Sequence, residues 1–334
     1  VSLEEMIDRM DAAGIERSLL IAAKVGVKHH PACYQVPYKL VADAVQKYPE
    51  RFSALAGVDP TEGMAGVREM EKAIRDDGFI GAHGYPHWFE LAPDHARYYR
   101  FYAKCVELDV PIQLQVGQSM VYDARYPRRS VGRPISLDSV ACDFPELKLI
   151  GIHVGIPWTD EMIAMAWKHA NVYIGCDAHR PTYWPESFVK YINSFGQDKV
   201  LFGTDFPVLP FEQTRKDIEA LGLKPQALKK LLRDNVLVET FGNASQQFPS
   251  GPQYIHWSAT NDPLTKDGRR LDGQDRLAGR AERLAVGLPF CVRFRLHPSV
   301  RVDLDASGEV RLAAVNGMRA RFKSDQGKIA IEPA

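Results

Sequence analysis

Polar side chains that can bind a metal ion or carry a proton stand at the ends of five successive apolar segments. They are His83 at the end of 79–83, Gln115 within 111–117, His153 near the end of 147–154, Asp177 and His179 after 171–176, and Asp205 after 199–204. Imidazole and carboxylate groups suit a borderline metal such as zinc, and they also suit general acid–base work. Because the pattern recurs after each segment, it predicts one shared site.

Each of these residues also has an ordinary structural interpretation when it is taken alone. A histidine at a strand end is often only hydrogen-bonded, and Asp205 can simply cap the next segment. Trp184 can line a substrate mouth or pack in the core. Arg133 can bind a substrate carboxylate or lie in a solvated basic loop. We take His83, Gln115, Arg133 and Trp184 as candidate substrate-binding residues, since the convergence on one mouth favours function.

Alternating short apolar strands and amphipathic helices are the elements that must position these side chains. The predicted strands are 15–23, 52–58, 79–83, 111–117, 147–154, 171–176 and 199–204. The predicted helices are 3–13, 36–48, 63–76, 94–108, 137–143, 159–169, 185–195, 211–221 and 225–235. Strict alternation predicts a parallel sheet covered by helices, with chemistry at the carboxyl ends of the strands.

Seven strands are one fewer than a closed (β/α)8 barrel needs. The chain opens on the predicted helix 3–13, so we expect a TIM-type α/β barrel whose first strand is missing and would precede Val1. An open α/β sheet is the alternative. An unpaired sheet edge favours association, so a homo-oligomer is possible.

The character of the chain changes near residue 243. Residues 243–334 carry 14 Lys and Arg against 10 Asp and Glu, and 11 of the 14 are Arg. Short apolar runs at 291–296, 300–304, 310–314, 319–322 and 329–331 alternate with hairpin-type turns. We therefore predict an α/β barrel over 1–242, a linker over 243–259 and a small antiparallel β-module over 260–334.

The overall composition indicates an ordinary soluble protein. The 334 residues balance 42 basic against 42 acidic side chains, which argues against binding to nucleic acid or to an anionic membrane. No apolar run is long enough to span a bilayer. The five cysteines are scattered without metal-type spacing, so we expect reduced thiols and a cytoplasmic location.

Three segments of the first part resemble the amidohydrolase superfamily, in its branch of amidohydrolase-related hydrolases and aminocarboxymuconate-semialdehyde-type decarboxylases. They are LKLIGIHVG at 147–155, NVY at 171–173 and KVLFGTDFP at 199–207. The resemblance covers about 1–242 and implies a metal-assisted barrel. It implies that His153 is the strand-six histidine and Asp205 the strand-eight aspartate, both candidate ligands of a divalent metal, most simply zinc. Gln115 stands where that family has a metal-binding histidine, and the strand-one ligand pair has no counterpart.

The resemblance implies a metal-dependent enzyme for a small-molecule substrate. Our first expectation is a hydrolase that acts on a C–N or C–O bond of a small anionic or cyclic substrate. His153 would serve as acid, base or oxyanion-stabilising group, Asp205 would bind the metal or take the proton of water, and His179 would supplement them. The alternatives are a non-oxidative decarboxylase with the same residues, and a catalytically incomplete remnant or fusion protein.

The C-terminal part has a different resemblance. The segments DGRRLDGQDRL at 267–277 and LPFCVRFRLHP at 288–298 resemble the C-terminal β-domain of heparinase II/III-like polysaccharide lyases. The helical catalytic domain of those lyases has no counterpart here, so lyase activity is not implied. Arg-rich segments suit anionic glycans, which makes polysaccharide binding a weak further hypothesis.

Overall fold

The computed structural model describes residues 2–28, 30–119, 125–240, 300–304, 310–314 and 319–322, and the side chains of 2–28, 30–119 and 125–236. The chain divides into two compact units, Val1–Gly251 and Pro252–Ala334. Among the described residues, no helix is both long enough and apolar enough to cross a bilayer.

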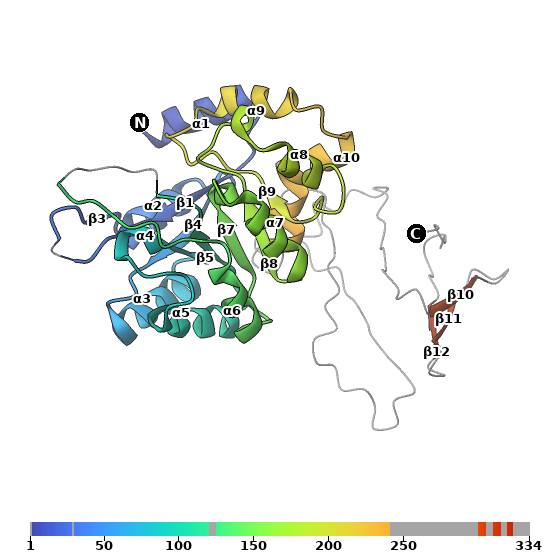
Figure 1. The fold of residues 1–334 in the computed structure, drawn as a ribbon, viewed down its shortest axis with the longest axis horizontal. Helices are drawn as coiled ribbons and strands as arrows, with labels where there is room; N and C mark the ends of the chain where they lie inside the picture. Colours follow the sequence, from blue (N-terminus) through green and yellow to red (C-terminus); the bar gives the residue numbers. More distant parts are fainter. Residues whose placement is uncertain are drawn as a thin grey trace. The chain divides into compact units, whose positions relative to one another are not determined.

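A curled sheet of seven parallel strands forms the centre of the first unit (Figure 1). Its strands, in their order across the sheet, are β1 (Ser18–Ala22), β4 (Phe52–Val58), β5 (Phe79–Gly84), β6 (Ile112–Gln115), β7 (Leu149–Ile152), β8 (Val172–Gly175) and β9 (Val200–Leu201). The strands neighbour one another in chain order, as in a TIM-type α/β fold. The predicted fold class is confirmed.

Helices cover the outside of this sheet. They are α1 (Leu3–Ala13), α2 (Tyr38–Lys47), α3 (Gly63–Asp76), α5 (Ala96–Glu107), α6 (Ser136–Asp143), α7 (Thr159–Lys168), α8 (Glu186–Ile192), α9 (Phe211–Glu219) and α10 (Pro225–Lys229). The aromatic residues of α5 recur at helical spacing, so Tyr98, Phe101 and Tyr102 are all fully buried. The predicted single helix 225–235 is instead α10 followed by a π-helix, Lys230–Thr240.

Two short elements beyond the strand ends have no counterpart in the sequence analysis. One is the antiparallel hairpin of β2 (Lys24–Val25) and β3 (Tyr34–Gln35), and the other is α4 (Pro86–Phe89). Their apolar residues pack together, since Val25 lies in one buried cluster with Tyr85 and Phe89. Both elements are too short to show hydrophobic periodicity, which explains why the sequence pattern did not reveal them.

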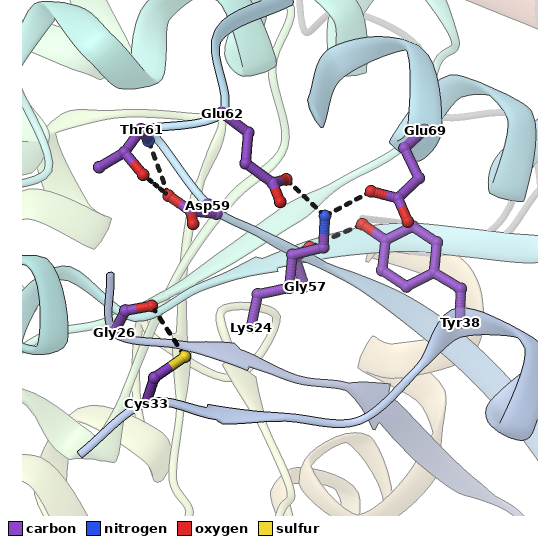
Figure 2. Close-up of polar contacts among 9 residues, drawn as sticks. All are labelled: Lys24, Gly26, Cys33, Tyr38, Gly57, Asp59, Thr61, Glu62 and Glu69. Atoms are coloured by element: carbon purple, nitrogen blue, oxygen red, sulfur yellow. Dashed lines mark hydrogen bonds and ion pairs between the residues drawn. The ribbon is translucent and has the colours of Figure 1, made fainter. Parts of the chain in front are cut away.

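A buried lysine fixes the base of this hairpin to the helix layer (Figure 2). Lys24 Nζ donates to Glu62 Oε2 and Glu69 Oε2, both at 2.6 Å, and the lysine is only 7% exposed. Burial alone would lower the pKa of Lys24, but the hydrogen bonds from its ammonium to the two glutamates outweigh burial, and the pKa rises. Nearby, the Tyr38 hydroxyl donates to the carbonyl oxygen of Gly57 at 2.6 Å.

Replacing Lys24 by methionine is expected to destabilise the first unit. The variant keeps the apolar stem but leaves two carboxylates facing each other without their cation. Because Glu69 is half exposed, we expect a loss of about 1–3 kcal/mol in the free energy of unfolding, below the cost for a fully buried pair. Urea unfolding measures it. Lys39→Met, which removes an exposed pair with Asp43, is the control and should change stability by less than about 0.5 kcal/mol.

The second unit contains a three-stranded antiparallel sheet among its described residues. Its strands are β10 (Val300–Leu304), β11 (Val310–Ala314) and β12 (Arg319–Phe322), which match three of the predicted strands. The other two predicted strands, the predicted linker 243–259 and the segments that resemble a heparinase-type domain lie outside the described residues. The predicted domain limits and polysaccharide binding therefore stay predictions.

Candidate active site at the carboxyl ends of the strands

Three polar residues lie just beyond neighbouring strands of the sheet. His153 follows β7, Asp177 lies two residues beyond β8, and Asp205 follows β9 within the FGTDFP segment. The strands β7, β8 and β9 pair in parallel in that order, so their carboxyl ends meet at one edge. The shared register therefore brings three residues that are far apart in sequence to one mouth.

His153 stands between two carboxylates. Its Nε2 atom lies 3.9 Å from Asp177 Oδ2 and 4.0 Å from Asp205 Oδ2. The backbone N–H of His153 donates to Asp177 Oδ1 at 2.8 Å, so Asp177 fixes the backbone that carries the imidazole. His153 Nε2 is buried and has no hydrogen-bond partner within the described residues. The arrangement leaves one imidazole nitrogen available to a bound molecule, with an acidic group on either side.

The backbone at this mouth takes up strained conformations. His153, Val154 and Asp205 have φ angles of 69°, 58° and 54°, in the left-handed region that side chains with a Cβ rarely adopt. Each such residue costs of the order of 1–3 kcal/mol and persists only where its surroundings hold it. One support is visible at Gly203, where an added Cβ would lie 2.9 Å from Asp177 Cβ. The glycine of FGTDFP thus makes room for the Asp177 side chain.

The carboxyl group of Asp205 holds its proton more tightly than an exposed aspartate does. Burial and the nearby charge of Asp177 raise its pKa to about 6, although His153 opposes the rise. A carboxyl group with a pKa near neutrality can exchange protons under ordinary conditions. Asp205 therefore supplies such a carboxyl group 4.0 Å from His153 Nε2.

Two further histidines reach the mouth from β5 and α4. Burial, with a smaller effect of His153, lowers the pKa of His83 to about 3 and that of His87 to about 4. Gln113 Nε2 lies 2.6 Å from His83 Nδ1, and the backbone N–H of Val131 donates to His87 Nδ1. The Nε2 atoms of both are buried and lack a partner among the described residues. Both imidazoles are neutral near pH 7.

Tyr85 lies between these two histidines in sequence and contributes a phenol to the same region. Its ring is 4.2 Å from the ring of His83, and the residue is 9% exposed. Burial raises the pKa of its hydroxyl, and the charges of Asp205 and Asp177 raise it further. Tyr85 is therefore a neutral hydrogen-bonding group close to Asp205 and Asp177.

The remaining predicted residues take different places. The His179 ring lies 6.4 Å from that of His153, and burial lowers its pKa, followed by the effect of His153. Trp184 is buried against Phe188, and its Nε1 donates to the carbonyl oxygen of His179 at 3.0 Å. Trp184 thus supports the loop that carries His179, and its contact with a substrate stays a prediction.

Gln115 is the last residue of β6, and Arg133 lies in the segment that follows this strand. Gln115 ends that strand and pairs with Ile152, directly before His153. Arg133 is more than half exposed, and its guanidinium pairs with Glu161 at 3.2 Å and lies 5.3 Å from the Trp158 ring. Since Glu161 already occupies this guanidinium, binding of a substrate carboxylate by Arg133 would require that ion pair to open.

The described part of the mouth does not assemble a full set of metal ligands. His153 and Asp205 offer two donor atoms 4.0 Å apart. Within the described residues, no three histidine, cysteine or carboxylate donors of the mouth lie within 4.8 Å of one another. Catalytic zinc sites use three protein ligands, so these residues alone do not fit a tightly held metal.

The structure brings His153 and Asp205 within 4.0 Å of each other, together with three neighbours that the sequence pattern marks less clearly. Asp177 was visible as a residue after a strand, yet its contact with the backbone of His153 leaves no trace in the sequence pattern. His87 and Tyr85 follow β5 in the segment HGYPH. That run of polar and aromatic residues after a strand is the signal that could have identified them.

The geometry defines a class: a TIM-type α/β protein with histidine and carboxylate side chains gathered at the carboxyl ends of its strands. The amidohydrolase family matches residues 6–236, about two thirds of the sequence. The chain belongs to this family.

Individual relatives include decarboxylases. Gamma-resorcylate decarboxylase from Polaromonas sp. strain JS666 is 25% identical over 212 residues, which cover 50% of this chain. The match spans 63% of that protein's length, under two thirds.

Solved structures share the fold. A TIM-barrel protein of Bordetella bronchiseptica, Bb4693, has a TM-score of 0.63 and 27% identity, with 73% of this chain and 84% of that chain covered. A dihydroxybenzoic acid decarboxylase from Polaromonas sp. JS666, solved with manganese and 2-nitroresorcinol, has a TM-score of 0.54 and 20% identity over 71% of this chain and 85% of that one.

Acidic conditions are expected to destabilise the first unit through His83 and His87. Below about pH 6.5 the unfolded chain binds protons at both imidazoles, whereas the folded chain takes them up only near pH 3 to 4. The free energy of unfolding should therefore fall as pH drops from about 6.5 to 4, by up to about 1.4 kcal/mol per pH unit for each histidine.

Urea unfolding between pH 7 and pH 4.5 measures this dependence. His83→Gln and His87→Gln should each make it shallower, while His95→Gln, at the exposed start of α5, should leave it unchanged. An equally steep dependence in both mouth variants would contradict the assignment.

Proposed function

We propose that this chain is a non-oxidative decarboxylase of a small hydroxylated aromatic acid. The observation that carries the proposal is the position of His153 Nε2, buried, without a partner among the described residues and within about 4 Å of two carboxylates. Membership of the amidohydrolase family and the likeness to gamma-resorcylate decarboxylase support it. Hydrolysis, our first expectation from the sequence, uses the same residues, but the curated relatives that support a reaction are gamma-resorcylate decarboxylases.

The reaction needs a proton at one carbon atom. The bond between the ring carbon and the carboxylate breaks, its electron pair stays on the ring carbon, and CO2 leaves. His153 then delivers one proton to that carbon from Nε2, forming the C–H bond of the product. Asp205, whose pKa is about 6, lies 4.0 Å from the same nitrogen and is placed to return a proton to the imidazole.

The residues around this pair supply orientation and exclude water. Asp177 holds the backbone of His153, and Tyr85 and His83 offer neutral groups that can hydrogen-bond to a phenol or carboxylate oxygen. A buried surrounding strengthens these contacts relative to water. We assign orientation of the substrate and exclusion of water to these residues together. We also propose that Gln115 and His179 contact the substrate.

A divalent metal can bind near the proposed site, but the proposed reaction does not depend on one. The Polaromonas decarboxylase structure holds manganese, while the sequence pattern predicted zinc. In this chain Asp205 and His153 are the described residues that could contribute ligands, and two ligands are too few to hold a catalytic metal tightly. We therefore assign no step to a metal, and activity is to be assayed with and without added manganese.

Loss of CO2 from a panel of hydroxybenzoic acids tests the proposal. The purified full chain should convert at least one acid to the corresponding phenol. Chromatography measures the formation of that phenol. In deuterated water the product should carry one deuterium at the carbon that lost the carboxylate. His153→Gln should lower the rate at least about 100-fold because it removes the proton donor.

The control is His95→Gln, which removes an exposed imidazole that caps α5 and lies outside the mouth. It should react at the wild-type rate. Failure of every acid on the panel, or full activity of His153→Gln, would overturn the proposal.

Asp177 is expected to act as a positioning residue. Asp177→Asn can still accept the hydrogen bond from the His153 N–H, whereas Asp177→Ala cannot and frees a strained backbone. We therefore expect kcat to fall about tenfold or more in Asp177→Ala and to recover partly in Asp177→Asn. Steady-state kinetics on the best acid measures both, and equal losses would show that Asp177 contributes its charge rather than its position.

A further inference from the structure

A second group of polar residues lies at the opposite end of the strands from the mouth. Asp138 and Cys142 are on α6, which precedes β7, and His169 lies between α7 and the start of β8. We call these three residues the α6 cluster. Because they sit near the amino ends of β7 and β8, they have no part in the proposed decarboxylation, and any role of the cluster is independent of that reaction.

The α6 cluster brings three different metal-binding groups together. One donor atom each from the Asp138 carboxylate, the Cys142 thiol and the His169 imidazole lie within 4.8 Å of one another. Asp138 and Cys142 are four residues apart on a helix, so they share one face. His169 is nearly buried, whereas Cys142 is exposed, which leaves a path for an ion and a water molecule.

Hydrogen bonds hold the backbone around the α6 cluster in place. The Asn171 side-chain amide donates to the carbonyl oxygens of Phe144 and Leu147, both at 3.0 Å, beyond the end of α6. The His169 carbonyl oxygen accepts from Lys199 Nζ at 3.1 Å. The segment that carries His169 and the helix that carries the other two donors are therefore joined, which keeps the three donor atoms near one another.

The Asp138 carboxylate is already ionised and oriented toward the imidazole. His169 Nε2 lies 2.6 Å from Asp138 Oδ1, and Lys168 Nζ donates to the same oxygen at 2.6 Å. The hydrogen bond from Lys168 and then that from His169 lower the pKa of Asp138. Lys168 is more than half exposed, so a divalent cation can replace its ammonium with little loss of buried contact.

We propose that Asp138, Cys142 and His169 form a binding site for a borderline transition-metal ion such as Zn²⁺, with water as the fourth ligand. Sulfur, nitrogen and carboxylate oxygen are the donors that zinc takes in tetrahedral sites, and one thiolate and one imidazole discriminate against Mg²⁺ and Ca²⁺. Binding requires loss of the thiol proton, so affinity rises with pH.

Titration of the full, reduced chain with Co²⁺ tests the site directly. Cobalt replaces zinc in such sites, and a cobalt–thiolate bond absorbs strongly in the near ultraviolet. A metal held by His153 and Asp205 gives no such absorption, since the mouth donors are imidazole and carboxylate and Cys176 is buried in the core. The wild-type chain should develop the thiolate band and lose it when Zn²⁺ is added.

Variants of the three ligands decide the assignment. Cys142→Ser, at an exposed position, should abolish the band, and Cys33→Ser should keep it. Asp138→Asn and His169→Gln should each weaken cobalt binding at least about tenfold, with circular dichroism checking that they remain folded. Absence of the band in wild type at millimolar Co²⁺, its persistence in Cys142→Ser, or unchanged affinity in folded Asp138→Asn would overturn the proposal.

Discussion

The parallel register of β7, β8 and β9 is the constraint on which the rest of the site depends. Three short strands, two of four residues and one of two, carry polar residues at their carboxyl ends. Any antiparallel arrangement would send one of those ends to the far side of the sheet. The buried faces of the strands supply the energy for this arrangement, since Ile152, Tyr173 and Leu201 all lie in one apolar cluster. The polar mouth is thus held in place by residues that take no part in its chemistry.

Within the mouth, burial and nearby charges together set which side chains are protonated. Burial keeps His83 and His87 neutral, so the charge near His153 comes mainly from Asp177 and Asp205. The two carboxylates are unequal: Asp177 accepts a backbone hydrogen bond, whereas Asp205 has its pKa raised to about 6 by burial and by the charge of Asp177. In the proposed reaction, one acid therefore fixes geometry and the other exchanges protons. Two chemically identical side chains acquire different roles through their surroundings.

The sequence predicted the parallel sheet, and it placed His153 and Asp205 at the carboxyl ends of two of its strands. It did so because buried parallel strands leave continuous apolar runs, and because their carboxyl ends are marked by His153 and Asp205. It did not predict the hairpin of β2 and β3, whose two-residue strands carry no periodicity. It also could not reveal that Arg133 forms an ion pair with Glu161. Nor could it reveal that Trp184 packs on Phe188, since such side chains meet only after folding. The second unit's predicted limits and binding properties rest on residues beyond those described.

The left-handed backbone at His153, Val154 and Asp205 has a consequence for how this sequence can change over generations. A glycine at Asp205, where no buried apolar group would be lost, relieves the backbone strain and removes the site's acid in one step. Selection for heat resistance alone would favour that change, while selection for chemistry at the mouth would eliminate it. The two pressures therefore diverge most sharply at strained residues whose side chains add little to the stability of the fold. A family member that keeps a side chain at such a position has been selected for chemistry. One that has glycine there has been selected for stability.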